Sequence, residues 1–189
     1  MKNLIKFCLV AIMILLPFSC DQDSSNITSS GVESFNKSDS KSTAEVHHGV
    51  PFSGNIVGSA TLHRSKNSIT GNIKTSGLTP GNAYTVWIII FHAGDVFIDV
   101  LYGTGHVIGG NGKANFSVHL NEGDISGTLL PPEANPVGLT DAKSEGIHLL
   151  IRDHGPAIPG AIDDQIHTVY GSCDVNTCAD VQHAIFMPI

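Results

Sequence analysis

Apolar and polar positions alternate along much of the chain with a period of two. Residues 59–64 and 69–75 alternate on either side of a polar turn, which predicts a β-hairpin. Residues 113–120 alternate in the same way and predict a strand with one buried face. Residues 84–91 are almost continuously apolar, as expected of a central strand that is covered on both faces.

The stretch 146–160 combines a strand pattern with a sharp stop. Its first seven residues alternate, so that branched apolar side chains share one face. Two prolines and two glycines then end the strand within residues 154–160, because proline removes a backbone donor and glycine relaxes φ. The stretch also carries the side chains with the greatest chemical capability, which are His148, Arg152, Asp153 and His154.

Shorter apolar segments predict further strands at 96–102, at 161–170 and at 181–186. Residues 121–145 predict a long loop, which is either functional or decorative. Turn signals separate eight or nine short strands, and there is no long helical period. The expected fold is therefore all-β, an immunoglobulin-like β-sandwich of eight or nine antiparallel strands.

Residues 103–112 are rich in glycine and contain a Gly-x-Gly sequence. A dinucleotide-binding loop needs a helix N-terminus to hold the phosphates, but the strand pattern of 113–120 follows instead. We therefore exclude dinucleotide binding for this stretch. The sequence Gly-Gly-Asn-Gly at 109–112 predicts a hairpin turn, and Asn111 within it is a candidate ligand-binding residue.

The N-terminus has the pattern of a bacterial lipoprotein signal. Two lysines precede a short apolar run, and Cys20 lies where that run meets a polar, serine-rich segment. We expect a signal peptide at 1–19, lipidation of Cys20, a disordered tether at 20–48 and a β-sandwich domain at 49–189. An ordinary cleaved secretory signal and an uncleaved anchor are the alternatives. Each places the domain outside the cytoplasm.

Charge and cysteine content narrow the possible partners. The formal net charge is −7, with 10 Lys and Arg and no basic cluster, which argues against nucleic acid as a ligand. In an oxidising compartment the nearby pair Cys173 and Cys178 predicts a disulfide. A zinc site at the same pair would need two more ligands at close range.

Several segments carry a resemblance to known proteins. Gly-Leu-Thr-Pro-Gly at 77–81 followed by Tyr84 is similar to the turn and tyrosine corner of immunoglobulin-like sandwiches. Together with 105–112 and His-Gly-Pro-Ala-Ile-Pro-Gly at 154–160, it resembles an uncharacterised family of secreted bacterial β-sandwich proteins over residues 50–189. A more distant likeness is to CHRD domains. Neither resemblance implies a catalytic residue.

The ten histidines suggest a second hypothesis, a copper or zinc site. His148 and His154 are the first candidate ligands, but six residues of extended strand separate them by roughly 20 Å. One of them would have to combine with His106 or with a histidine from another strand. Arg152 is a candidate for binding an anionic ligand through its planar guanidinium group.

The sequence favours a binding or structural module that is anchored by lipid at the bacterial cell envelope. Its candidate ligand-binding residues are Arg152, His148, His154, His106 and Asn111. A Gly-x-Ser-x-Gly nucleophile elbow is absent from the sequence, so hydrolysis is the weaker hypothesis. The expected partners are the membrane, through the lipid, and a protein or glycan of the envelope. The alternative is a histidine-liganded metalloprotein, including an enzyme, on the same sandwich.

Overall fold

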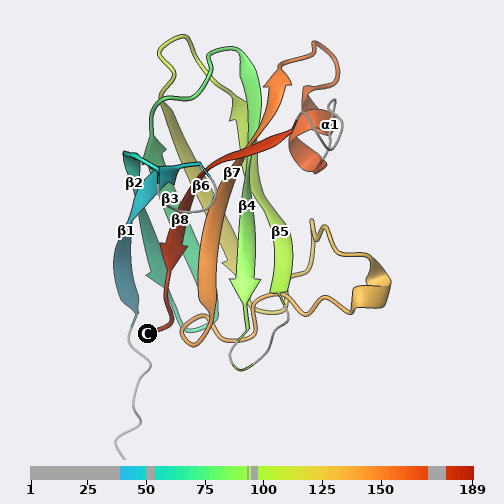
Figure 1. The fold of residues 1–189 in the computed structure, drawn as a ribbon. Coiled ribbons are helices and arrows are strands. Elements are labelled where there is room, and N and C mark those ends of the chain that lie inside the picture. The colour runs from blue at the N-terminus through green and yellow to red at the C-terminus, as the bar shows by residue number, and fades with distance from the viewer. Residues whose placement is uncertain (1–38, 50–53, 93, 95–97, 170–177) are drawn as a thin grey trace, which may run out of the picture. The chain divides into compact units, whose positions relative to one another are not determined.

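The computed structural model describes residues 39–49, 54–92, 94, 98–169 and 178–189. Within them, eight antiparallel strands form one nearly closed barrel-like sheet (Figure 1), which confirms the all-β prediction. The strands are β1 (Ser40–His48), β2 (Ile56–Arg64), β3 (Ser68–Thr75), β4 (Asn82–Phe91), β5 (Ile98–Val107), β6 (Ala114–Asn121), β7 (Gly146–Pro156) and β8 (Ala179–Phe186). Two short helices are η1 (Pro132–Ala134) and α1 (Ile162–His167).

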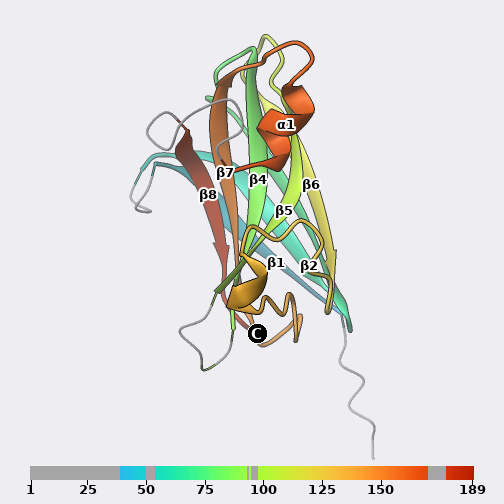
Figure 2. The same ribbon diagram turned by 90° about the vertical axis from the view of Figure 1, so that its right-hand side faces the viewer.

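The strand order is β5-β4-β7-β8-β1-β2-β3-β6, so the sheet consists of two four-stranded halves. β1 pairs with β2 along its length, but it pairs with β8 only at His47–His183 and His48–Gln182. The two ends of the order, β5 and β6, lie beside each other (Figure 2). The predicted pair of separate sheets is therefore replaced by one continuous sheet, because β1 joins the two halves.

The core lies inside the barrel, where alternate residues of both halves meet. Leu62, Ile73 and Phe116 come from one half, and Ile88 and Leu149 come from the other; all are at most 1% exposed. This packing follows directly from the period-two pattern of the strands.

Gly71 of β3 shows how tightly the halves interlock. A Cβ atom on Gly71 would lie 2.8 Å from Val118 Cγ2 and 3.0 Å from Leu149 Cδ1. These two side chains come from β6 and β7, which belong to opposite halves of the sheet. The position therefore has room only for glycine, and side chains from both halves fill the space above it.

The tyrosine corner that the sequence resemblance implied is present at the start of β4. The backbone N–H of Thr79 donates to Tyr84 Oη at 2.9 Å, and Tyr84 Oη donates to an Asp153 carboxylate oxygen at 2.7 Å. Asp153 also accepts from Asn82 Nδ2 at 3.0 Å and from the backbone N–H of Gly155 at 2.7 Å. Asp153 is therefore a structural residue that fixes the end of β7 against β4.

One predicted boundary was wrong. Residues 40–48, which were assigned to the tether, form β1, whose side chains alternate between inward and outward positions. The strand is hard to recognise because Ala44 and Val46 are its only inward apolar side chains, and it is held mainly by backbone pairing with β2. β7 runs past the alternating residues 146–152 and ends at Pro156, within the predicted stop at 154–160.

The predicted strand at 161–170 is replaced by α1. Two acidic residues occupy the first turn of this helix, where their negative charges interact favourably with the positive end of the helix dipole. The Gln165 side chain accepts from the backbone N–H of Ile158 at 2.9 Å and donates to the Pro156 carbonyl at 3.0 Å. Ile166 packs against Gly105 of β5, where a Cβ atom would lie 2.8 Å from Ile166 Cβ. These contacts tie the helix to the sheet.

The signal peptide at 1–19, Cys20, the tether up to residue 38 and Cys173 lie outside the described residues. The predictions for them stay predictions. Among the residues with a described structure, no helix is both long and apolar enough to cross a membrane.

Candidate functional site

The histidines that the sequence analysis grouped together contact different partners. His148 on β7 packs its ring against Phe91 of β4, with the ring centroids 4.3 Å apart. His106 on β5 packs against Phe116 of β6, with the ring centroids 4.5 Å apart. Both imidazoles are half-buried, and each contributes to the packing of its own pair of strands.

His154 of β7 is buried and contacts Thr85 of the neighbouring strand β4. Thr85 Oγ1 donates to the Ile166 carbonyl at 2.6 Å and lies 3.0 Å from His154 Nε2. Because the hydroxyl proton is already committed, His154 Nε2 must be the donor of this second bond. His154 Nδ1 then faces Cys178 Sγ at 3.7 Å. The predicted Cys173–Cys178 disulfide stays a prediction, since Cys173 is not among the described residues.

Arg152 and Asn111 also have structural partners. Arg152 Nε lies 2.9 Å from an Asp180 carboxylate oxygen. Burial raises the pKa of Asp180, and the positive charge of Arg152 opposes that shift. Asn111 Oδ1 accepts from the backbone N–H of Lys113 at 3.0 Å and closes the turn between β5 and β6. Neither side chain is aimed at a shared binding site with the histidines.

The predicted copper or zinc site would need at least three converging ligands. No group of three His, Cys, Asp or Glu side chains within the described part of the chain could hold a metal ion. The candidate ligands His106, His148 and His154 lie on separate parts of the sheet, where the contacts given above engage them.

A buried charged cluster anchors the long loop between β6 and β7. His92 Nδ1 lies 2.7 Å from a Glu145 carboxylate oxygen, and its Nε2 lies 3.3 Å from an Asp99 carboxylate oxygen. Asp99 also accepts from the backbone N–H of Gly138 at 2.6 Å, and Glu145 accepts from that of Thr140 at 3.2 Å. The cluster is closed to ligands, because both carboxylates are at most 1% exposed. Its role is to hold the loop against the barrel.

An open polar surface covers the outer side of one half of the sheet. We call it the polar face. Four adjacent strands each contribute three exposed or half-buried side chains to it: Lys41, Thr43 and Glu45; Ser59, Thr61 and His63; Thr70, Asn72 and Lys74; and Asn115, Ser117 and His119. The registers of the strands align these residues in rows across the sheet.

Hydrogen bonds between strands fix several of these side chains. Ser117 Oγ donates to Asn72 Oδ1 at 2.6 Å, and Thr70 Oγ1 lies 3.0 Å from His119 Nδ1. Because the side chains sit on paired strands, their donors and acceptors hold fixed positions before any ligand arrives.

Two adjacent depressions hollow the polar face. The first, of about 380 Å³, is lined by Lys41, Ser59, Thr61, Asn72, Lys74 and Asn115. The second shares Lys74 and Asn115 with the first and extends to Lys113. The polar face is therefore the candidate functional site.

No family model, curated protein or solved structure matches the chain. The candidate site therefore rests on its own geometry. Part of the signal for it was present in the sequence, because polar residues alternate with apolar residues or glycine along β2, β3 and β6. Recognising it required the order and register of the strands, which place these four polar edges side by side.

The histidines near the β1–β8 joint predict a loss of stability in acid. Burial lowers the pKa of His183, and the neighbouring His47 lowers it further; their rings stack 5.8 Å apart. Burial also lowers the pKa of His148, with a smaller effect from His183. The folded protein therefore binds fewer protons than the unfolded chain below the ordinary histidine pKa of 6.5. Stability is greatest above that pH and falls as the pH drops through and below it.

We expect the melting temperature to fall between neutral and mildly acidic pH, and to fall less steeply in the variant His183→Gln. For each proton that the unfolded chain binds in excess, the free energy of unfolding can change by about 1.4 kcal/mol per pH unit. His63→Gln is the matched control, because His63 is exposed on β2. An equal acid-induced loss in His183→Gln and in the wild type would contradict the prediction.

Proposed function

We propose that the protein is a lipid-anchored, extracytoplasmic binding module, and that the polar face binds its ligand without catalysis. The observation that carries the proposal is a surface of twelve polar side chains, three from each of four adjacent strands, with two depressions in it. Fixed hydroxyl and amide groups can pair with a ligand that presents many hydroxyl groups. The ligand class that this chemistry favours is a glycan of the cell envelope.

The location is supported by the signal pattern and Cys20 in the sequence. The division of the sheet into two four-stranded halves, together with the tyrosine corner, supports the proposed kinship with immunoglobulin-like and secreted bacterial β-sandwich proteins. The metalloprotein alternative gains no support from the arrangement of the described histidines.

The proposal is tested by measuring the binding of the full-length protein to a panel of neutral and acidic polysaccharides. Thr61 lies in the floor of the first depression, so Thr61→Phe would fill it while keeping a residue that suits a strand. We expect at least one polysaccharide to bind and Thr61→Phe to weaken that binding tenfold or more, by about 1.4 kcal/mol.

Glu133→Phe is the matched control, because Glu133 is exposed in η1 and lies outside the sheet. It should bind as the wild type does, and the melting temperatures of both variants should show that they are folded. If no polysaccharide binds, or if Thr61→Phe leaves binding unchanged, the polar face is not the ligand surface.

A further inference from the structure

The two depressions of the polar face are positively charged on a protein that is acidic as a whole. The formal net charge of the chain is −7. Yet Lys41, Lys74 and Lys113 line the depressions, and neither lining contains an Asp or Glu residue. Within the described residues, none of these three lysines forms an ion pair. Their ammonium groups are therefore available to an anionic ligand.

Glu45 is the acidic member of the twelve side chains that define the polar face. Glu45 lies on β1, and its carboxylate is 3.4 Å from His47 Nε2. The side chain turns toward the β1–β8 joint, where Glu45 and His47 line a different depression. Among the described residues, Glu45 therefore forms no ion pair with any of the three lysines.

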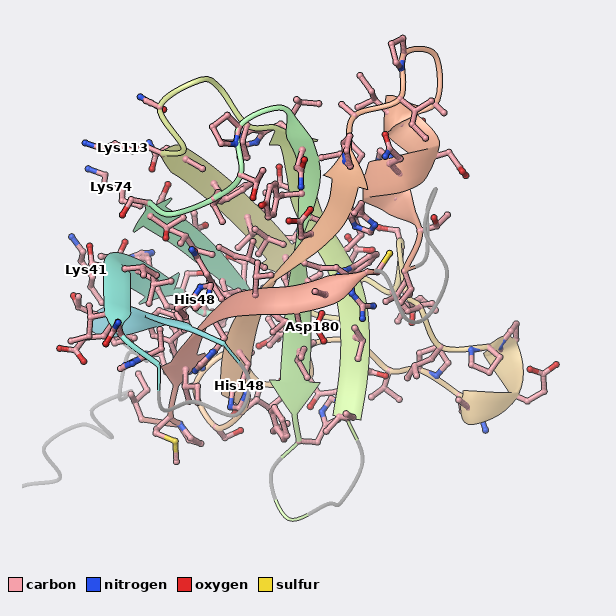
Figure 3. The ribbon with its side chains drawn as sticks, turned by 45° about the horizontal axis from the view of Figure 1, so that its top comes forward. Lys41, His48, Lys74, Lys113, His148 and Asp180 are labelled. Carbon is pink, nitrogen blue, oxygen red and sulfur yellow. The ribbon has the colours of Figure 1, made fainter. Side chains whose placement is uncertain are left out.

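The lysines are spread over a distance that suits an extended ligand. Figure 3 shows Lys41, Lys74 and Lys113 projecting from the same side of the molecule. From the strand registers, Lys41 and Lys74 are separated by four residues along the strands and by two strands across the sheet, about 16 Å between Cα atoms. Lys113 directly precedes β6, and it lies about 8 Å from Lys74 of the neighbouring β3 by the register of the two strands. Lys74 lines both depressions and connects them.

We propose that the ligand is an acidic polysaccharide that lies across both depressions. Its carboxylate or sulfate groups would pair with Lys41, Lys74 and Lys113, and its hydroxyl groups would pair with Ser59, Asn72 and Asn115. This inference rests on the proposed function and adds the charge and the length of the ligand.

Other anionic polymers fit this surface less well. The polar face has no Phe, Tyr or Trp side chain on which nucleic acid bases could stack, and three lysines are few for a phosphate backbone. The apolar side chains that line the second depression are Val57 and Ala114, which are small and give an acidic peptide little surface on which to anchor. Hydroxyl and amide groups between the lysines match the hydroxyl groups of a sugar chain instead.

The test compares the binding of full-length protein to polygalacturonate, dextran sulfate, neutral dextran and duplex DNA. We expect both acidic polysaccharides to bind more tightly than neutral dextran, with an affinity that falls as salt is added. Each of Lys41→Gln, Lys74→Gln and Lys113→Gln should weaken binding by about two- to fivefold, and the triple variant should weaken it further. Lys66→Gln is the matched control, because Lys66 is exposed in the turn between β2 and β3 and lines neither depression.

The outcomes separate this inference from the proposed function. If neutral and acidic polysaccharides bind equally and Thr61→Phe blocks both, the polar face is the site but the inference fails. If acidic polysaccharides bind but the triple lysine variant binds as well as the wild type, the inference also fails. If duplex DNA binds as tightly as the acidic polysaccharides, the surface recognises polyanions in general and the inference of a polysaccharide ligand fails. If nothing binds, both proposals fall.

Discussion

We expect Arg64→Met to lower the free energy of unfolding by about 3–5 kcal/mol, because it leaves three buried backbone carbonyls without their charged donor. Arg64 is fully buried on the inner side of β2. Its guanidinium group donates to the carbonyls of Ala142, Glu145 and Met187, which connects β2 to the start of β7 and to the C-terminal residues. Burial lowers the pKa of Arg64, and the charges of Glu145 and Asp141 oppose that shift.

The measurement is urea-induced unfolding of full-length protein, with Lys66→Met as the matched control. Lys66 is exposed two residues further along the chain, so its replacement should change the stability little. A double-mutant cycle with Glu145→Gln should show that Arg64→Met costs less once the carboxylate is neutral. A loss below about 1 kcal/mol for Arg64→Met would show that the buried guanidinium is dispensable.

Deleting residues 40–48 should abolish cooperative unfolding. This change removes β1, which pairs with β2 along its length and makes the only paired joint between the two halves among the described strands. It also removes Val46, which is fully buried, and uncovers the edge of β2. The lost interactions are comparable with the whole stability of a typical domain, about 5–15 kcal/mol.

A pair of point variants tests the same strand without shortening the chain. Val46→Asp places a charge in the core and should unfold the protein or lower its melting temperature strongly. Thr43→Asp adds the same side chain at an exposed position of β1 and should be tolerated. Circular dichroism during heating distinguishes the two results. A folded Val46→Asp variant with an unchanged melting temperature would mean that β1 is peripheral.

The sequence predicted those strands whose side chains carry a strong pattern. The hairpin of β2 and β3 was predicted because its apolar residues alternate, and β4 was predicted because it is apolar almost throughout. β1 was missed because Ser, Thr and Lys fill most of its positions and its pairing uses backbone groups, which leave no trace in the side-chain pattern. α1 was mistaken for a strand because six residues are too few to separate the two periods.

The site depends on contacts that the sequence does not encode locally. His148 and His154 seemed available because chemical capability can be read from a single residue, but their partners Phe91 and Thr85 come from β4. The polar face could not be predicted, because no single residue in it signals a binding site. Its residues are individually ordinary, and only the order of the strands brings Lys41 and Lys74 to one depression.

The narrow joint between the two halves has a mechanical consequence. The chain enters the domain at β1, and the polar face belongs to the same half of the sheet as β1. A pulling force between the N-terminal segment and a ligand on the polar face would pass through β1, β2 and β3, which pair with one another along most of their lengths. The two residue pairs between β1 and β8 lie outside this load path. Tension applied in this way would therefore not load the narrow pairing between β1 and β8.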